Sequence, residues 1–193
     1  MTQKTTAITH ARYPGDIGYT VDGDLPGATI DGVTYHRHPN GGGLVAETAF
    51  VAETAFVGIN ARVYGHARVS GDAQVCGNAR VFGHANVSGS AQVFGHATVS
   101  DDALVSDYAE VFGHANVSGS AEVWNDARVY GHANVSGNAR VFGHARVSGD
   151  AEVFGHANVS GSARVFGDAQ VSGDAQVSGT TVVNVLTGRK TRI

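Results

Sequence analysis

Valine occupies every sixth position from Val45 to Val183, 24 times without exception. Alanine stands four residues after each of these valines from Ala49 to Ala175. In the resulting unit, Val-x-Gly-x-Ala-x, each alanine lies two residues before the next valine. Because side chains alternate along a strand, the alanine and that valine share one face. The period therefore predicts units of a very short strand followed by a corner.

The corner positions carry residues that tolerate turn or left-handed backbone geometry. Glycine usually comes first and is followed by Asn, Asp, Ser or His, as in Gly65-His66 and Gly77-Asn78. Where that glycine is missing, residues that also suit a turn replace it: Asp101, Asp107 and Asn125. We therefore expect a turn at every corner.

Three such units close a triangular coil of 18 residues, and coils stack at the strand spacing of about 4.8 Å. The 24 units make about eight coils and a prism of about 38 Å. The predicted fold is an all-β triangular solenoid over residues 44–186, with a small N-terminal cap in residues 1–43 and a basic tail in 187–193. Its interior would be a ladder of valine and alanine, in which each buried valine contributes about 1.5–3 kcal/mol before chain entropy is subtracted.

The unit, which reads Val81-Phe82-Gly83-His84-Ala85-Asn86 in one instance, resembles that of the hexapeptide-repeat, left-handed parallel β-helix family. The family unit is aliphatic, variable, turn, turn, small, variable. The amino-acid sequence of this unit is most similar to that of uncharacterised hexapeptide proteins of bacteria and their phages. The resemblance implies a left-handed winding, although parallel crossovers are usually right-handed. It also implies homotrimers whose prisms pack side by side.

Composition and charge limit the other classes of protein. The 42% of apolar residues argues against disorder, and a formal charge of −4 gives no attraction for nucleic acid or an anionic membrane. Cys76 is the single cysteine and lies at an outward position, so no internal disulfide can form and a reducing compartment is expected. Met1–Tyr13 does not read as a signal peptide, and no apolar run has the length of a membrane span. We expect a cytoplasmic protein.

The segment before the repeat is expected to cover the first coil, whose strand edges and valines would otherwise be exposed. Short strands separated by Pro-Gly and Asp-Gly turns are predicted there, including one stretch over residues 28–35. Phe50 and Phe56 point outward by phase, which suggests that this segment packs over them. An alternative role for His36, Arg37 and His38 is to form part of a site.

Outward positions 18 residues apart stack above one another, and one face carries the largest apolar column. Phe94, Phe112 and Tyr130 lie on consecutive coils, and Phe166 lies further along. Because contiguous apolar strips usually mark contacts, we predict that this column is the subunit interface of the homotrimer.

Charged columns flank the aromatic residues. Arg128, Arg146 and Arg164 lie on one side, and Asp150 and Asp168 lie on the other. A nucleotide or other anionic small molecule could bind between prisms, with its ring stacked on Phe112 or Tyr130 and its phosphate held by Arg128 or Arg146. A protein partner that docks on the same surface is the other possibility.

Histidines precede the two aspartates along the same corner column: His96, His114 and His132. Histidine is one of the residues that tolerate corner geometry, which accounts for the column without a ligand. The alternative is a metal or anion site, because imidazole is the commonest metal ligand. Three histidines in a straight row fit tetrahedral geometry poorly, so a metal would need ligands from a second subunit. No other cofactor is expected.

Two enzyme classes share the family fold. Its acyltransferases use acyl-coenzyme A and usually carry an inserted loop with a catalytic histidine, whereas this chain has no insertion from Val45 to Val183. Its carbonic anhydrases use two histidines five positions apart, whereas the repeat histidines here differ by 12 or 18. No catalytic residue is assigned. A non-enzymatic, oligomerising scaffold or binding module is therefore favoured over an acyl- or acetyltransferase, and a carbonic anhydrase-like metal protein comes last.

Overall fold

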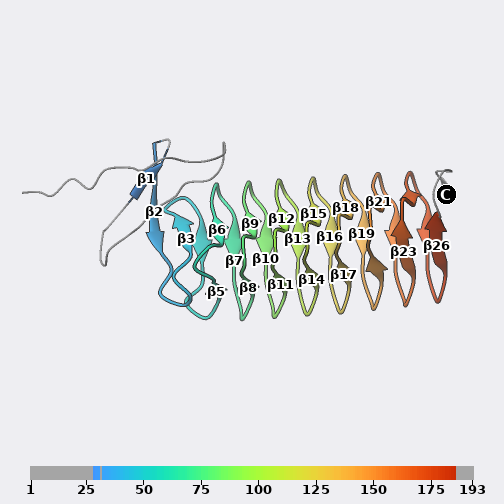
Figure 1. Ribbon diagram of the computed structural model, residues 1–193, viewed down its shortest axis with the longest axis horizontal. Coiled ribbons are helices and arrows are strands. Elements are labelled where there is room, and N and C mark those ends of the chain that lie inside the picture. Colours follow the sequence, from blue (N-terminus) through green and yellow to red (C-terminus); the bar gives the residue numbers. More distant parts are fainter. Residues whose placement is uncertain (1–27, 31, 186–193) are drawn as a thin grey trace, which may run out of the picture.

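The computed structural model describes residues 28–30 and 32–185, which form a prism-shaped β-solenoid (Figure 1). Coils follow one another along the prism in chain order, and three sheets run along its length. None of these residues belongs to a helix that could cross a membrane.

Successive strands of the repeat belong in turn to the first, second and third sheet. The first sheet contains β1 (Ala28–Ile30), β2 (Val33–Arg37), β3 (Leu44–Ala46), β6 (Arg62–Val63), β9 (Arg80–Val81), β12 (Thr98–Val99), β15 (Asn116–Val117), β18 (Asn134–Val135), β21 (Glu152–Val153) and β24 (Gln170–Val171). The second contains β4 (Phe50–Val51), β7 (Arg68–Val69), β10 (Asn86–Val87), β13 (Leu104–Val105), β16 (Glu122–Val123), β19 (Arg140–Val141), β22 (Asn158–Val159) and β25 (Gln176–Val177). The third contains β5 (Phe56–Val57), β8 (Gln74–Val75), β11 (Gln92–Val93), β14 (Glu110–Val111), β17 (Arg128–Val129), β20 (Arg146–Val147), β23 (Arg164–Gly167) and β26 (Val182–Val185).

The register of these sheets confirms the predicted coil of 18 residues. Repeat strands pair in parallel with strands 18 residues away, as Val93 does with Val111. Backbone hydrogen bonds join the coils, and the amide of Phe112 donates to the carbonyl of Val129 at 2.9 Å. The predicted all-β solenoid of about eight coils is therefore correct.

The core consists of the predicted small side chains. Every valine and alanine of the repeat from Ala55 to Val171 is buried, with 0% exposure. At the two ends of the repeat, Val51 and Ala175 are only partly buried. Each coil removes three valine and three alanine side chains from water, and this burial is the main contribution to the stability of the fold.

The corners have left-handed backbone geometry at their first residue. Gly113 has φ +72°, and a Cβ there would lie 3.1 Å from the backbone nitrogen of Gly131 on the next coil. Glycine is therefore needed both for its φ and for the close stacking of coils. The residues that replace glycine adopt the same region, with φ of 60° at Asp101 and Asp107 and 58° at Asn125. The Asp101 carboxylate also accepts a hydrogen bond from the Gly119 amide at 2.9 Å.

Residues 33–43 lie against the edge of the first coil, and β1 pairs with β2 on the outer side. β1 and β2 form an antiparallel hairpin around Gly32, and β2 pairs antiparallel with β3, which lengthens the first sheet. The Asn40 side chain donates to the carbonyl of Ala55 at 3.1 Å, and the Gly43 amide donates to that of Val57 at 2.8 Å. The hairpin thus covers the edge of the first sheet, and residues 40–43 cover the edge of the third.

The two outward phenylalanines of the first coil differ in their surroundings. Phe56 is partly buried, and a Cβ at Gly41 would lie 2.9 Å from its ring. Phe50 is 49% exposed, and the Arg68 guanidinium lies 5.0 Å from its ring centre. The rest of the predicted cap and the basic tail lie outside the described residues.

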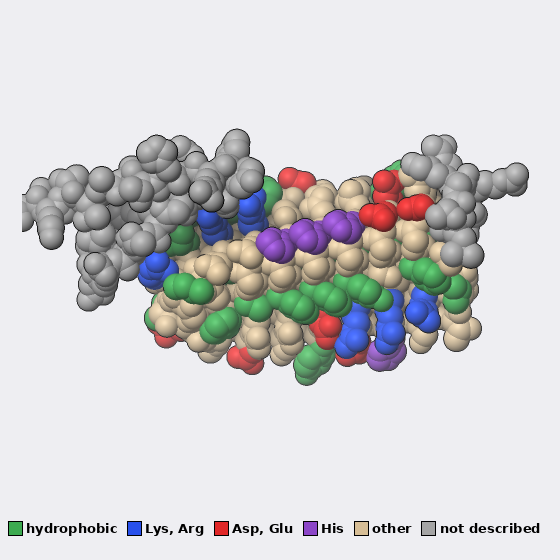
Figure 2. Space-filling model, in the orientation of Figure 1, with side chains coloured by type: hydrophobic (Ala, Val, Ile, Leu, Met, Phe, Trp, Pro, Cys, Tyr) green, Lys and Arg blue, Asp and Glu red, His purple; other side chains and the backbone are tan. Residues whose placement is uncertain are grey.

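The winding of the coils can be followed on the third sheet in Figure 2. There the chain passes from Arg128 through Tyr130 to His132, and rows of blue, green and purple side chains follow one another from bottom to top. The chain therefore runs upward across the near face while the coils advance from left to right. This is a left-handed coil, as the resemblance implies.

Candidate interaction surface

The third sheet presents three parallel rows of side chains to solvent. The position before each buried valine forms one margin, the position after it forms the centre, and the corner toward the first sheet forms the other margin. We call the central residues Phe94, Phe112, Tyr130 and Phe166 the aromatic column.

Three members of the aromatic column are stacked face to face. Ring centres are 4.8 Å apart between Phe94 and Phe112 and 5.0 Å apart between Phe112 and Tyr130, with planes within 3° of parallel. These rings are partly buried by one another. Ser148 occupies the next coil, so Phe166 stands apart from the stack. The structure therefore brings together three of the four predicted interface residues.

The arginine margin holds Arg128, Arg146 and Arg164 on consecutive coils. Arg128 forms an ion pair with Glu110 at 3.1 Å, and the Arg164 guanidinium carbon lies 5.7 Å from the ring centre of Phe166. Arg146 lies between them and forms no ion pair with any residue in the described ranges. Of the two arginines predicted to hold a phosphate, Arg146 is thus the one without an acidic partner.

The opposite margin begins with the three stacked histidines. Ring centres are 4.8 Å apart between His96 and His114 and 4.9 Å apart between His114 and His132, with planes within 6° of parallel. Because a nitrogen lone pair lies in the plane of its ring, parallel stacked rings do not direct two nitrogens at one point. Among the described residues no group of three or more ligating side chains is placed to hold an ion. A metal at this column stays a prediction that needs other ligands or rotamers.

Beyond the histidines the same margin becomes acidic. Asp150 and Asp168 are exposed, and within the described part of the chain neither forms an ion pair. Figure 2 shows this change as a purple row followed by red side chains. In its C-terminal half the third sheet therefore has a positive margin and a negative margin on either side of the aromatic column.

In the described residues, the stacked aromatic side chains of the other two sheets form pairs. Trp124 and Phe142 stack on the second sheet with ring centres 4.5 Å apart, and Tyr64 and Phe82 stack on the first at 4.8 Å. Burial raises the pKa of Tyr64, although nearby arginines oppose this shift. The third sheet thus carries the longest aromatic stack of the described chain.

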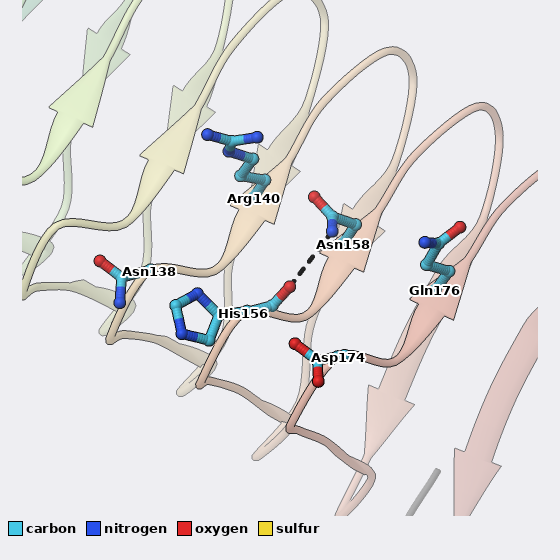
Figure 3. A pocket seen from close by; sticks show the side chains of 6 residues that line it. All are labelled: Asn138, Arg140, His156, Asn158, Asp174 and Gln176. Carbon is cyan, nitrogen blue, oxygen red and sulfur yellow. Dashed lines mark hydrogen bonds between the residues drawn. The ribbon is translucent and has the colours of Figure 1, made fainter.

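A polar hollow between the first and second sheets was not predicted. It has a volume of about 410 Å³ and lies along the corner and the adjoining strand positions of three consecutive coils, where it is lined by Asn138, Arg140, His156, Asn158, Asp174 and Gln176 (Figure 3). The Asn158 side chain donates to the carbonyl of His156 at 3.1 Å. The 18-residue spacing places both columns in the sequence, but the hollow between them depends on how the side chains of the corner and the strand are arranged.

In the described residues, no hydrogen bond joins a serine, threonine or cysteine side chain to a histidine ring. Cys76 lies in the central row of the third sheet, and burial raises the pKa of its thiol, which lowers the fraction present as the reactive thiolate. Strands from β6 to β25 follow one another every six residues, and no loop interrupts them. The arrangement offers surface recognition by rings and charges.

Comparison with known proteins supports the solenoid. A family model described as the YdcK beta solenoid repeat matches residues 61–74, 73–89 and 91–108, a stretch that includes the strands from β6 to β13. A search of curated proteins found no match. Together, the matched stretch and the coil geometry show that the chain is a repeat β-solenoid protein, similar over residues 61–108 to the YdcK solenoid repeats.

Proposed function

We propose that the protein is a non-enzymatic, self-associating β-solenoid that acts as a scaffold or binding module in the cytoplasm, with the third sheet as its contact surface. The observation that carries this proposal is the stack of Phe94, Phe112 and Tyr130 on consecutive coils. A contiguous apolar strip of this kind usually marks a contact. The family resemblance favours a trimer as the assembled form.

The fold suits such a role because its surface is preorganised. The side chains of the strip are held at the strand spacing by a fully buried core and by hydrogen bonds between coils. Stacked rings have little rotamer freedom left to lose, so less entropy is lost when a partner covers them.

The proposal is tested by placing a charge in the aromatic column. Phe112→Asp should abolish self-association, because a carboxylate would be buried in the contact. The matched control is Phe142→Asp, which disrupts an aromatic pair on the second sheet and should leave the assembly intact. Sedimentation velocity gives the mass of each variant, and thermal melting checks its folding. Assembly of Phe112→Asp at the wild-type mass would contradict the proposal.

A second candidate function is the binding of an aromatic anion such as a nucleotide. It is favoured because the aromatic stack ends at Tyr130. Phe112 has a ring on each side, whereas Tyr130 is followed by Ser148 on the next coil. Two coils separate Tyr130 from Phe166, about 9.6 Å, which leaves room for one further ring. Arg146 lies on the same coil as Ser148 and could hold a phosphate there.

Ligand-observed NMR with AMP tests this second function. Saturation transfer from the protein to AMP is expected in the wild type and should be lost in Arg146→Gln. Arg140→Gln, which changes an arginine on the second sheet, should retain it. Equal transfer in both variants would contradict a site at Arg146.

A further inference from the structure

We propose that copies of this chain associate in parallel and in register through the third sheet, with Arg146 and Arg164 of one copy facing Asp150 and Asp168 of the next at the same coil. The proposal rests on the self-association proposed above and specifies its geometry. The occupant of the third sheet is thus a second copy of the chain.

The charges that carry this inference lie on opposite margins of one face. Arg146 and Asp150 belong to one coil, as do Arg164 and Asp168, and in each case the two positions are four apart in the sequence. Four residues of extended chain span at most about 13 Å, with the central row between the two margins. No ion pair joins these residues within the described chain. Their charges are therefore available to another copy.

The symmetry axis of the assembly determines which margin of one copy lies against which margin of the next. An axis parallel to the prism, in a pair or around a trimer, brings the arginine margin of one copy against the acidic margin of the next at the same coil. Arg146 then faces Asp150 and Arg164 faces Asp168. On the two preceding coils, Glu110 faces His114 and Arg128 faces His132, and Glu110 and Arg128 are already paired with each other within one chain. An antiparallel pair brings each margin onto itself and places arginine against arginine. Charge complementarity therefore selects the parallel arrangement.

The other two sheets lack this complementarity. On the first sheet the equivalent positions of one coil hold Arg80 and His84, and on the second they hold Glu122 and Asp126 on one coil. Arg68 and Asp72 give the second sheet one opposite pair, but the next coils do not repeat it. On the third sheet full opposite charges occupy two consecutive coils, next to the longest aromatic stack.

Charge reversal tests the pairing. Arg146→Asp with Arg164→Asp should weaken self-association at least about tenfold, and Asp150→Arg with Asp168→Arg should do the same, because each makes both margins alike. The chain that carries all four substitutions restores opposite margins and should assemble as the wild type does. Arg80→Asp with Arg140→Asp makes the same charge change on the other two sheets and should leave assembly unchanged. Analytical ultracentrifugation measures the association, and thermal melting confirms that each variant is folded.

Cross-linking tests the register. Cys76 and Ser148 both lie in the central row of the third sheet, four coils or about 19 Å apart. Parallel copies place each of these residues opposite itself, so a short bismaleimide should join copies through native Cys76 and, in a Cys76→Ser background, through Ser148→Cys. Ser106→Cys on the second sheet, also in the Cys76→Ser background, is the control that should not cross-link. An antiparallel pair could join copies at only one of the two positions.

The possible failures are distinguishable. A wild type that is a single chain at every concentration would overturn both the proposed function and this inference. An assembly that Phe112→Asp dissociates, but that tolerates both charge reversals or cross-links at only one central position, would overturn the parallel register and leave the proposed function standing.

Discussion

At the scale of single residues, the corner glycines of the repeat meet two separate constraints. One is a left-handed φ, which Asp101 also adopts where glycine is missing. The other is that a Cβ at most corners would contact the backbone of the next coil. Gly173 and Gly179, at the last corners, have no such neighbour among the described residues, so the two effects can be separated.

Replacing a corner glycine should cost more inside the stack than at its end. Gly131 has φ +73°, and its Cβ would lie 2.9 Å from the Gly149 nitrogen, whereas Gly173 has φ +64° with no atom within 4 Å. Gly173→Ala should reduce the free energy of unfolding by about 1–2 kcal/mol, the cost of left-handed geometry. Gly131→Ala should cost at least about 1 kcal/mol more, because the coils must shift. Urea unfolding measures both, and equal losses would refute the steric term.

Stability should fall in alkali through Tyr64. Burial raises the pKa of this phenol above its ordinary value of 10.0, so the folded state favours the neutral form. The associated stability is fully present below the unfolded pKa and is lost as pH rises through the folded pKa. Between about pH 8 and about pH 11 the wild type should therefore lose more unfolding free energy than Tyr64→Phe. Identical losses in the two proteins would rule out this role for Tyr64.

At the scale of elements, the repeat strands were predictable and the pairing of the hairpin was not. The valine period fixes the position of each repeat strand, and Asp31-Gly32 indicated the turn between β1 and β2. No periodicity relates residues 28–43 to the coils, so neither the antiparallel pairing of β2 with β3 nor the hydrogen bonds of Asn40 could be derived.

Asn40 should hold the cap to the first coil. Asn40→Ala removes the hydrogen bonds that its side chain donates to the carbonyls of Ala55 and Thr54. A loss of about 1 kcal/mol is expected, confined to the N-terminal end. Hydrogen exchange should therefore quicken at Gly43 and Val57 and stay unchanged near Val129. Asn138→Ala, at an exposed corner far along the prism, is the control. Unchanged exchange at Gly43 and Val57 would show that the side chain does not anchor the cap.

At the scale of the whole molecule, the 18-residue spacing predicted every outward column, because each coil repeats the one before it. It gave the aromatic column and its charged margins by residue number. It did not reveal that Arg128 pairs with Glu110 while Arg146 has no acidic partner among the described residues, since that depends on side-chain conformation. The arrangement of two copies relative to each other is inferred from the distribution of charge over the third sheet. The repeat period of a single chain does not predict that arrangement.

Native mass spectrometry of the purified wild type tests the central claim, self-association through the third sheet, most directly. The spectrum should show two or three chains under gentle conditions and the mass of one chain after denaturation. Phe112→Asp should give one chain under both conditions. The account would be contradicted if the wild type were detected as a monomer at every concentration. It would also be contradicted if Phe112→Asp assembled as the wild type does.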